Sequence, residues 1–385
     1  MADPHSIRHY AHGKWDRHLT CVICGADIPD YNPRFLGNRS DWARLNKKRH
    51  GRSVIVPATE VEETDLTRYP EEWMQFHRAI LYDSATTEYS ISGITCGTSA
   101  QPWRSVPWDA DKARIAGRVL GNDRWNANYY MANLKGHDEN REAGRRIGYP
   151  VHAHCWLLLD RVIGLDFVKQ NLREFIYTVE AFWSEHWIDW KVKLGTPWSV
   201  ASKHVVPVAV KYNKNTLFPA ARMANQPCSP CKSRDLEDLV SRSIFGGSPS
   251  RAARPALAAS YTNIPVDIAL NIVDMLYTGR PLCREGVYDT RNLLNALQWK
   301  LPDSYWIRKS IEHRSALFEA EGRVAPGSPF DWATFSLGFQ ALMVRPNWFC
   351  KSGVCHRQRV LFILNRMKEH LSKTGSLANT ALEAI

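Results

Sequence analysis

The chain has 385 residues, a formal net charge of +11 and a 44% share of hydrophobic residues. This hydrophobic share is typical of globular proteins and excludes wholesale disorder, while the length predicts two or three folded units. The first residues lack the apolar segment of a secretory signal, and no run approaches the ~18 uninterrupted apolar residues of a membrane-spanning helix. We therefore expect a protein of the cytoplasm, the nucleus or both, whose nine cysteines are reduced or bound to metal.

The sequence pattern of the first part of the chain predicts an irregular, partly β region. Residues 1–20 form a polar, histidine-rich segment that we expect to be a tail, and residues 21–212 contain short segments separated by proline, glycine and asparagine. The alternation from Tyr89 to Ile94 predicts a strand that ends at a turn. Residues 137–148 are charged and contain glycine, which predicts a loop.

A C-x-x-C pair, Cys21 and Cys24, opens this region and is followed directly by Gly25. That spacing lets two thiolates reach one metal ion from a tight turn, and glycine permits the backbone conformation that the turn needs. Much later, His152 and Cys155 form a second pair with comparable chelating spacing. Together the two pairs predict a Cys3His structural zinc site. His154 is an alternative ligand to His152, because the choice depends on geometry.

A basic run from Arg44 to Arg52 lies between these pairs. It is compatible with a nuclear-import signal, a patch that faces phosphates, or simply a solvated basic turn. With the net charge and the cysteine pairs, it supports an alternative function, in which the chain is a nucleic-acid-binding zinc protein with a basic surface.

After residue 150 the pattern becomes helical. Apolar residues spaced by three and four from Asp166 to Trp187 predict an amphipathic helix that packs on a core. Residues 213–260, rich in proline, glycine and serine, predict a linker and a domain boundary. The linker holds another C-x-x-C pair, Cys228 and Cys231. A second zinc site would need distant partners, and the candidates are Cys350, Cys355 and His356.

Residues 261–310 predict three short helices. Asn263 is a suitable N-cap for the first helix, and Pro265 fits its first turn. Its apolar residues recur at every fourth position: Ile264, Ile268, Ile272 and Leu276. A second helix is expected from Asp289, after a loop at 277–288, and a third after Leu301-Pro302. A short helix that is apolar nearly all round needs cover on more than one side, from its own domain or from a partner.

These helices resemble the F-box domain. Ile264-Pro265-Val266-Asp267-Ile268, with Ile272 and Leu276, is similar to the Leu-Pro-x-Glu-Ile-x-x-x-Ile-x-x-x-Leu opening of that family, and the Leu-Pro-Asp-x-x-Trp at 301–306 is similar to its close. The resemblance implies docking of a Skp-type adaptor of cullin–RING ubiquitin ligases, through Ile264, Pro265, Ile268, Ile272 and Leu276.

The N-terminal part carries a second resemblance. The C-x-I-C-G at Cys21, the Ser92-Gly93-Ile94 segment and the Pro-Val-His-x-x-Cys-Trp ending at Trp156 are similar to large F-box protein families of filamentous fungi. In those families the F-box follows the Cys-Trp segment, as it does here. The resemblance implies a substrate-recruiting subunit of a ubiquitin ligase.

Helical patterns continue over residues 311–372, and we expect these helices to pack behind the F-box-like module. One is expected to start at Ser328-Pro329, and another carries a stripe from Val360 to Leu371. Residues 373–385 predict a loose tail. The expected fold class is thus α+β: a partly β N-terminal region with a zinc clasp, followed by an all-helical, F-box-like C-terminal half.

Enzymatic function is not expected from the motifs. The sequence contains no glycine-rich phosphate loop and neither G-x-S-x-G nor H-E-x-x-H. Cys155 stands beside His154, but adjacent side chains rarely converge as a nucleophile and its base. We therefore expect a non-catalytic protein.

Overall fold

A computed structural model describes residues 19–28, 54–63, 72–96, 104–115, 126–134, 141, 143–186, 229–245, 264–277, 283–311, 318–320, 330–345 and 348–373. The chain divides into two compact units, a sheet unit mainly of residues 27–63 and 74–153, and a helical unit mainly of residues 154–385. Both a mixed sheet and many helices are present, which confirms the α+β class. Within the described residues, no helix combines the length and hydropathy required to span a bilayer.

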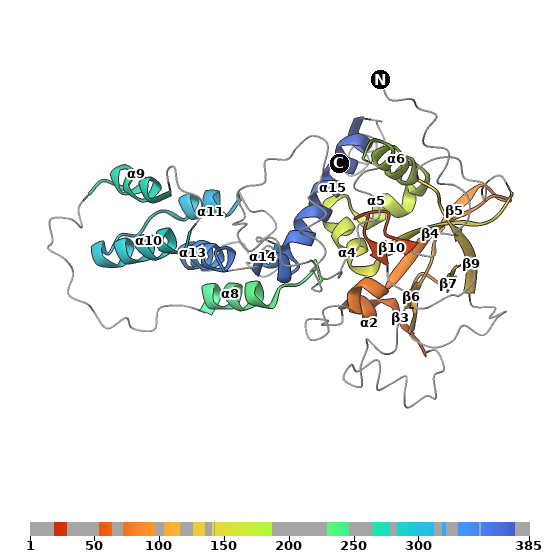
Figure 1. Cartoon of the computed structure of the whole chain (residues 1–385), viewed down its shortest axis with the longest axis horizontal. Helices are drawn as coiled ribbons and strands as arrows, with labels where there is room; N and C mark the ends of the chain where they lie inside the picture. Colours follow the sequence, from red (N-terminus) through yellow and green to blue (C-terminus); the bar gives the residue numbers. More distant parts are fainter. Residues whose placement is uncertain are drawn as a thin grey trace, which may run out of the picture. The chain divides into compact units, whose positions relative to one another are not determined.

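The sheet unit contains an eight-stranded mixed sheet in the order β3-β8-β6-β4-β10-β9-β7, with β5 paired to β4 (Figure 1). Its strands are β3 (Val54–Pro57), β4 (His77–Asp83), β5 (Glu88–Ile91), β6 (Ile94–Cys96), β7 (Arg104–Pro107), β8 (Lys112–Ile115), β9 (Asn126–Met131) and β10 (Ile147–His152). A separate two-stranded sheet joins β1 (Leu19–Thr20) to β2 (Asp27–Ile28). A short helix, α2 (Ala58–Glu63), packs on β3 and β8, and a 3-10 turn, η3 (Glu72–Gln75), precedes β4.

Strand β10 is central and pairs antiparallel with β4 over six residues, from Ile147 opposite Tyr82 to His152 opposite His77. All six residues of β10 are buried. The loop predicted at 137–148 therefore ends earlier, because Ile147 already belongs to the strand. The strand predicted from Tyr89 is present as β5, and its turn falls at Ser92 and Gly93, before β6 begins.

Three helices follow β10: α4 (Ala153–Val162), α5 (Leu165–Gln170) and α6 (Leu172–Glu185). The single helix predicted from Asp166 is thus two helices, separated at Asn171, whose side-chain amide donates to the Phe167 carbonyl. The apolar stripe is nevertheless buried as expected over the described residues, which include Phe175, Val179 and Trp183. Trp187 lies outside them.

The prediction of a linker at residues 213–260 is wrong over part of that range. Residues 234–245 form a helix, α8 (Arg234–Phe245), whose Leu236, Leu239 and Val240 are fully buried. These side chains pack against Phe335 and Phe339 in one hydrophobic core. The helix was not predicted, because the proline and glycine residues that flank this short amphipathic segment are typical of a linker. Residues 213–228 and 246–260 lie outside the described residues.

The remaining helices are α9 (Val266–Tyr277), α10 (Arg284–Leu297), α11 (Asp303–Ile311), α13 (Trp332–Met343), α14 (Trp348–Lys351) and α15 (Val354–Lys373). Two predicted starts need correction. Helix α10 begins at Arg284 with Cys283 as its N-cap, so Asp289 lies inside the helix and the expected loop is shorter. Helix α13 begins at Trp332 because the Asp331 side chain accepts from the Thr334 N–H, so Ser328-Pro329 is not its start.

The C-terminal helices pack in two ways. Helix α13 contacts α10 and α11, and its Leu337 joins the core formed by Ala269, Val273 and Trp306, as expected for a helix behind the three-helix module. Helix α15 instead packs on α6 and α14. Its stripe, Val360, Leu364, Met367 and Leu371, is buried as predicted. The tails predicted at 1–20 and 373–385 fall almost entirely outside the described residues.

Candidate metal centre

The first cysteine pair lies in a tight turn between β1 and β2. Cys21 follows the last residue of β1, and the chain turns back through Cys24 before β2 begins at Asp27. Gly25 has a φ of 70°, in the left-handed region that favours glycine. This confirms the reason given for a glycine after the pair. Both cysteines are fully buried.

The second pair lies where β10 leads directly into α4. His152 is the last residue of the strand, and Cys155 is in the first turn of the helix. Two backbone hydrogen bonds bring the first pair to this place: the Val22 N–H donates to the Pro150 carbonyl at 2.8 Å, and the His152 N–H donates to Cys21 Sγ at 3.4 Å. Contacts of β10 thus bring together Cys21 and His152, which are 131 positions apart in the sequence.

The four predicted residues come together as the Cys3His cluster (Cys21, Cys24, His152 and Cys155). Their ligand atoms all lie within 4.8 Å of one another, and all four residues are buried. A tetrahedral ion with metal–sulfur bonds of about 2.3 Å would set its sulfur ligands roughly 3.8 Å apart, so one ion fits this arrangement. A donated N–H on Cys21 Sγ suits a thiolate, which is the metal-binding form of cysteine. The cluster could therefore hold a metal ion.

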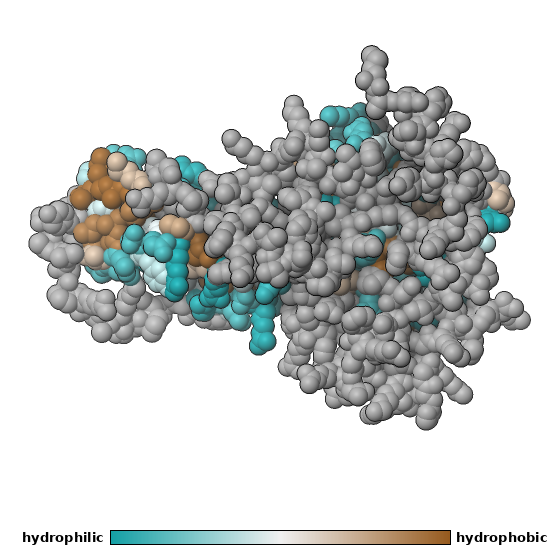
Figure 2. Space-filling view, in the orientation of Figure 1, coloured by the Kyte–Doolittle hydropathy of each residue, from teal (hydrophilic) through white to brown (hydrophobic). Residues whose placement is uncertain are grey.

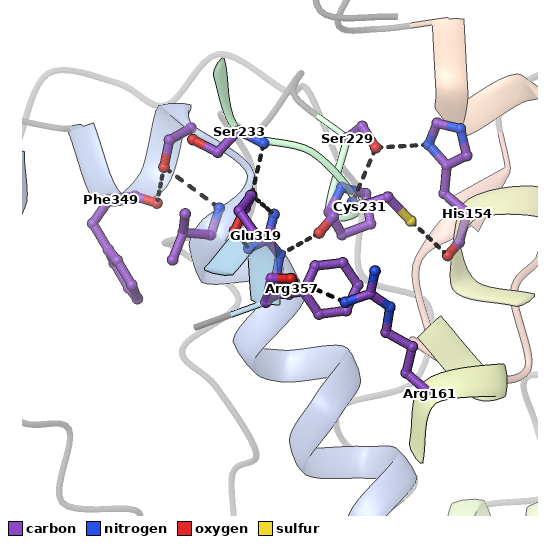
Figure 3. A network of polar contacts seen from close by, with 12 residues as sticks. His154, Arg161, Ser229, Cys231, Ser233, Glu319, Phe349 and Arg357 are labelled. Carbon is purple, nitrogen blue, oxygen red and sulfur yellow. Dashed lines mark hydrogen bonds and ion pairs between the residues drawn. The ribbon is translucent and has the colours of Figure 1, made fainter. Parts of the chain in front are cut away.

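The alternative ligand His154 faces a different neighbourhood. Its Nδ1 is hydrogen-bonded to Ser229 Oγ at 2.7 Å (Figure 3), and its ring stacks on Trp73 with an interplanar angle of 5°. The structure thus resolves the choice that the sequence left open, and His152 is the histidine of the cluster.

A second metal site receives no support within the described residues. The Cys231 thiol donates to the His154 carbonyl at 3.1 Å, and burial raises its pKa to about 12, so the sulfur stays protonated. Cys355 and His356 are buried on α15, and among the described residues only the Cys3His cluster brings together side chains that could hold a metal ion. Cys228 and the side chain of Cys350 lie outside the described part, as does the basic run at Arg44–Arg52.

Two buried neighbours of the cluster were missed by sequence reasoning. Arg359, on α15 and fully buried, donates from Nε to the Cys24 carbonyl at 2.9 Å. His77 is the strand partner of His152, and burial lowers its pKa to about 3, so its imidazole is neutral. Of the two, only Arg359 offered a signal in the sequence, because it is an arginine within an apolar helix pattern.

Comparison with known proteins identifies no relative with such a site, because the chain matches no protein-family model, no curated protein and no solved structure.

Proposed function

We propose that the chain is a non-catalytic adaptor that docks a Skp-type subunit of a cullin–RING ubiquitin ligase through helix α9 and recruits a protein substrate. One observation carries the proposal: the five residues that match the F-box opening are all at least partly exposed. Ile268 is 44% exposed, Pro265 is exposed, and Ile264, Ile272 and Leu276 are half-buried. A helix that only filled a core would bury its isoleucines.

The small residues of α9 face the core in place of these isoleucines. Ala269 and Val273 are buried against Tyr305 and Trp306 of α11. The orientation is reinforced where the Tyr305 hydroxyl donates to Asp274 Oδ1 at 2.9 Å. Leu270 also packs on this core, whereas Val266, Ile268 and Met275 stay exposed and are available to another surface.

Further apolar side chains extend this exposed face. Val266 and Met275 of α9 are 50% and 74% exposed, and Tyr288 of α10 is 50% exposed. Figure 2 shows hydrophobic surface gathered over the α9 and α10 part of the molecule. Burying one such side chain contributes roughly 1.5–3 kcal/mol, so an apolar patch of this kind typically marks a protein–protein interface.

The test is binding of the purified full chain to a Skp-type adaptor, by co-purification and calorimetry. Replacing Pro265 and Ile268 by alanine should weaken binding by about 2 kcal/mol or more, roughly 30-fold, because interface anchors act at this scale. The melting temperature should stay nearly unchanged, since both side chains are exposed. Tyr177→Ala, at an exposed position on α6, is the matched control and should bind as the wild type does. Equal binding of the double variant and the wild type, or no binding by either, would refute the docking assignment.

We further propose that the Cys3His cluster holds one structural zinc ion. Three thiolates and one imidazole form a donor set typical of structural zinc, and such sites are closed by four protein ligands. Burial of all four residues supports a closed site rather than one with a free position for a substrate. Zinc would join the β1–β2 turn to the β10–α4 junction, and thereby stabilise the N-terminal part as a structural or recognition region.

A further inference from the structure

Helix α15 carries two fully buried arginines, Arg357 and Arg359, that have different surroundings. Arg357 forms an ion pair with buried Glu319 and donates to the Pro230 carbonyl (Figure 3). Arg359 reaches the metal-binding turn, where its Nε donates to the carbonyl of Cys24. Arg359 is therefore bonded to the backbone of a residue of the Cys3His cluster.

The contact with Arg359 also matters electrostatically, because a Cys3His cluster that holds a divalent ion is charged. Three thiolates, a neutral imidazole and a divalent cation sum to a net charge of −1. A net charge is costly in a buried site unless an opposite charge lies close by. Arg359, whose Nε donates to the Cys24 carbonyl, places a positive charge beside this cluster.

The hydrogen bond also has a geometric effect. The Cys24 peptide lies in the turn that ends at Gly25, and a bond to its carbonyl fixes the orientation of that turn. Groups bonded to metal-ligand residues in this way orient them and tune their affinity for the ion.

We propose that Arg359 is a positioning residue of the metal centre and compensates the negative charge of that centre. Through Arg359, binding of a divalent cation and packing of helix α15 depend on each other. This inference rests on the zinc assignment above. Such coupling is reciprocal. Loss of the ion should therefore destabilise the start of α15, and loss of the arginine should lower the affinity for the ion.

The first experiment measures the zinc affinity of the full chain by competition with a chelator, and follows Co²⁺ binding by its absorption spectrum. Arg359→Met should weaken zinc binding by about 10–100-fold, as removal of a neighbour of this kind usually does. Arg359→Lys should restore most of the affinity, because it returns the charge. The Co²⁺ spectrum of both variants should keep the shape of the tetrahedral wild-type site.

The matched control removes the other buried arginine together with its partner, as Arg357→Met with Glu319→Gln. It changes the same helix at equal burial and should leave zinc affinity within about threefold of the wild type, since no ligand of the ion loses a neighbour. A wild-type chain that binds no metal would overturn the zinc assignment. Equal affinity in the wild type and in Arg359→Met, or an equal loss in the control, would overturn the role of Arg359 alone.

The second experiment tests the coupling from the metal side. Chelation of the ion from the wild-type chain should increase hydrogen exchange of the backbone amides at 355–360 more than that of α13. Unchanged exchange of α15 in the metal-free chain would refute the coupling, and this measurement needs no variant that has to fold.

Discussion

Loss of the metal ion is expected to unfold the region around the Cys3His cluster, at a cost of about 10 kcal/mol or more, the scale of zinc binding in small structural sites. The cluster joins two segments whose residues Cys21 and His152 are 131 positions apart, so the proposed ion would close a long loop. Cys155→Ser should lower the zinc content from about one ion per chain towards zero, and it should greatly lower the melting temperature. Elemental analysis and thermal unfolding provide the two measurements.

Cys96→Ser is the matched control for this prediction. Cys96 is also buried, at 2% exposure, but it lies in β6 and its thiol donates to Gln75 Oε1. This variant should keep its zinc and lose little stability, because a serine hydroxyl can donate to the same oxygen. A metal-free wild-type chain that melts at the temperature of the metal-loaded one would contradict the structural role of the ion.

The second large effect is expected at the Arg357–Glu319 ion pair. The side chain of Arg357 is fully buried and that of Glu319 is 4% exposed, and the Ser233 N–H donates to the same carboxylate at 3.0 Å. Arg357→Met would leave a buried carboxylate without its cation. We expect the free energy of unfolding to fall by about 3–5 kcal/mol, as it does when one partner of a buried pair is removed.

A double variant separates the charge effect from the packing effect. Adding Glu319→Gln to Arg357→Met removes the unpaired charge and should recover a large part of the loss, which denaturant unfolding can measure. Arg366→Met is the control on the same helix, because its pair with Glu369 is exposed and should contribute less than about 1 kcal/mol. A loss at Arg357 no larger than that at Arg366 would show that the pair does not hold this region together.

The residues of the Cys3His cluster were predictable because their chemistry is local. Two residues at chelating spacing on each of two segments identify a site without any knowledge of the fold, and Gly25 marks the turn that one pair requires. The choice between His152 and His154 was not predictable. It depends on β10 ending at His152 and on Ser229, which approaches His154 from a distant part of the chain.

Elements without a clear periodic signal were harder to predict. Strand β10 is buried on both faces, so its sequence shows no alternation, and Pro150 disguises it further. Helix α8 is short and lies between segments rich in proline and glycine, although Leu236, Leu239 and Val240 have helical spacing. Arg359 was not predictable as a neighbour of Cys24, because the two residues are 335 positions apart in the sequence.

That separation has a consequence for biosynthesis. A ribosome adds roughly 5–20 residues per second, so Arg359 leaves it roughly 10–40 s after Cys155. During that interval the nascent chain already carries all four residues of the Cys3His cluster, but it lacks the helix that contacts Cys24. For the proposed zinc ion to bind, the thiols must stay reduced until it is supplied. The yield of folded protein in cells should therefore depend on zinc supply during translation as well as on stability afterwards.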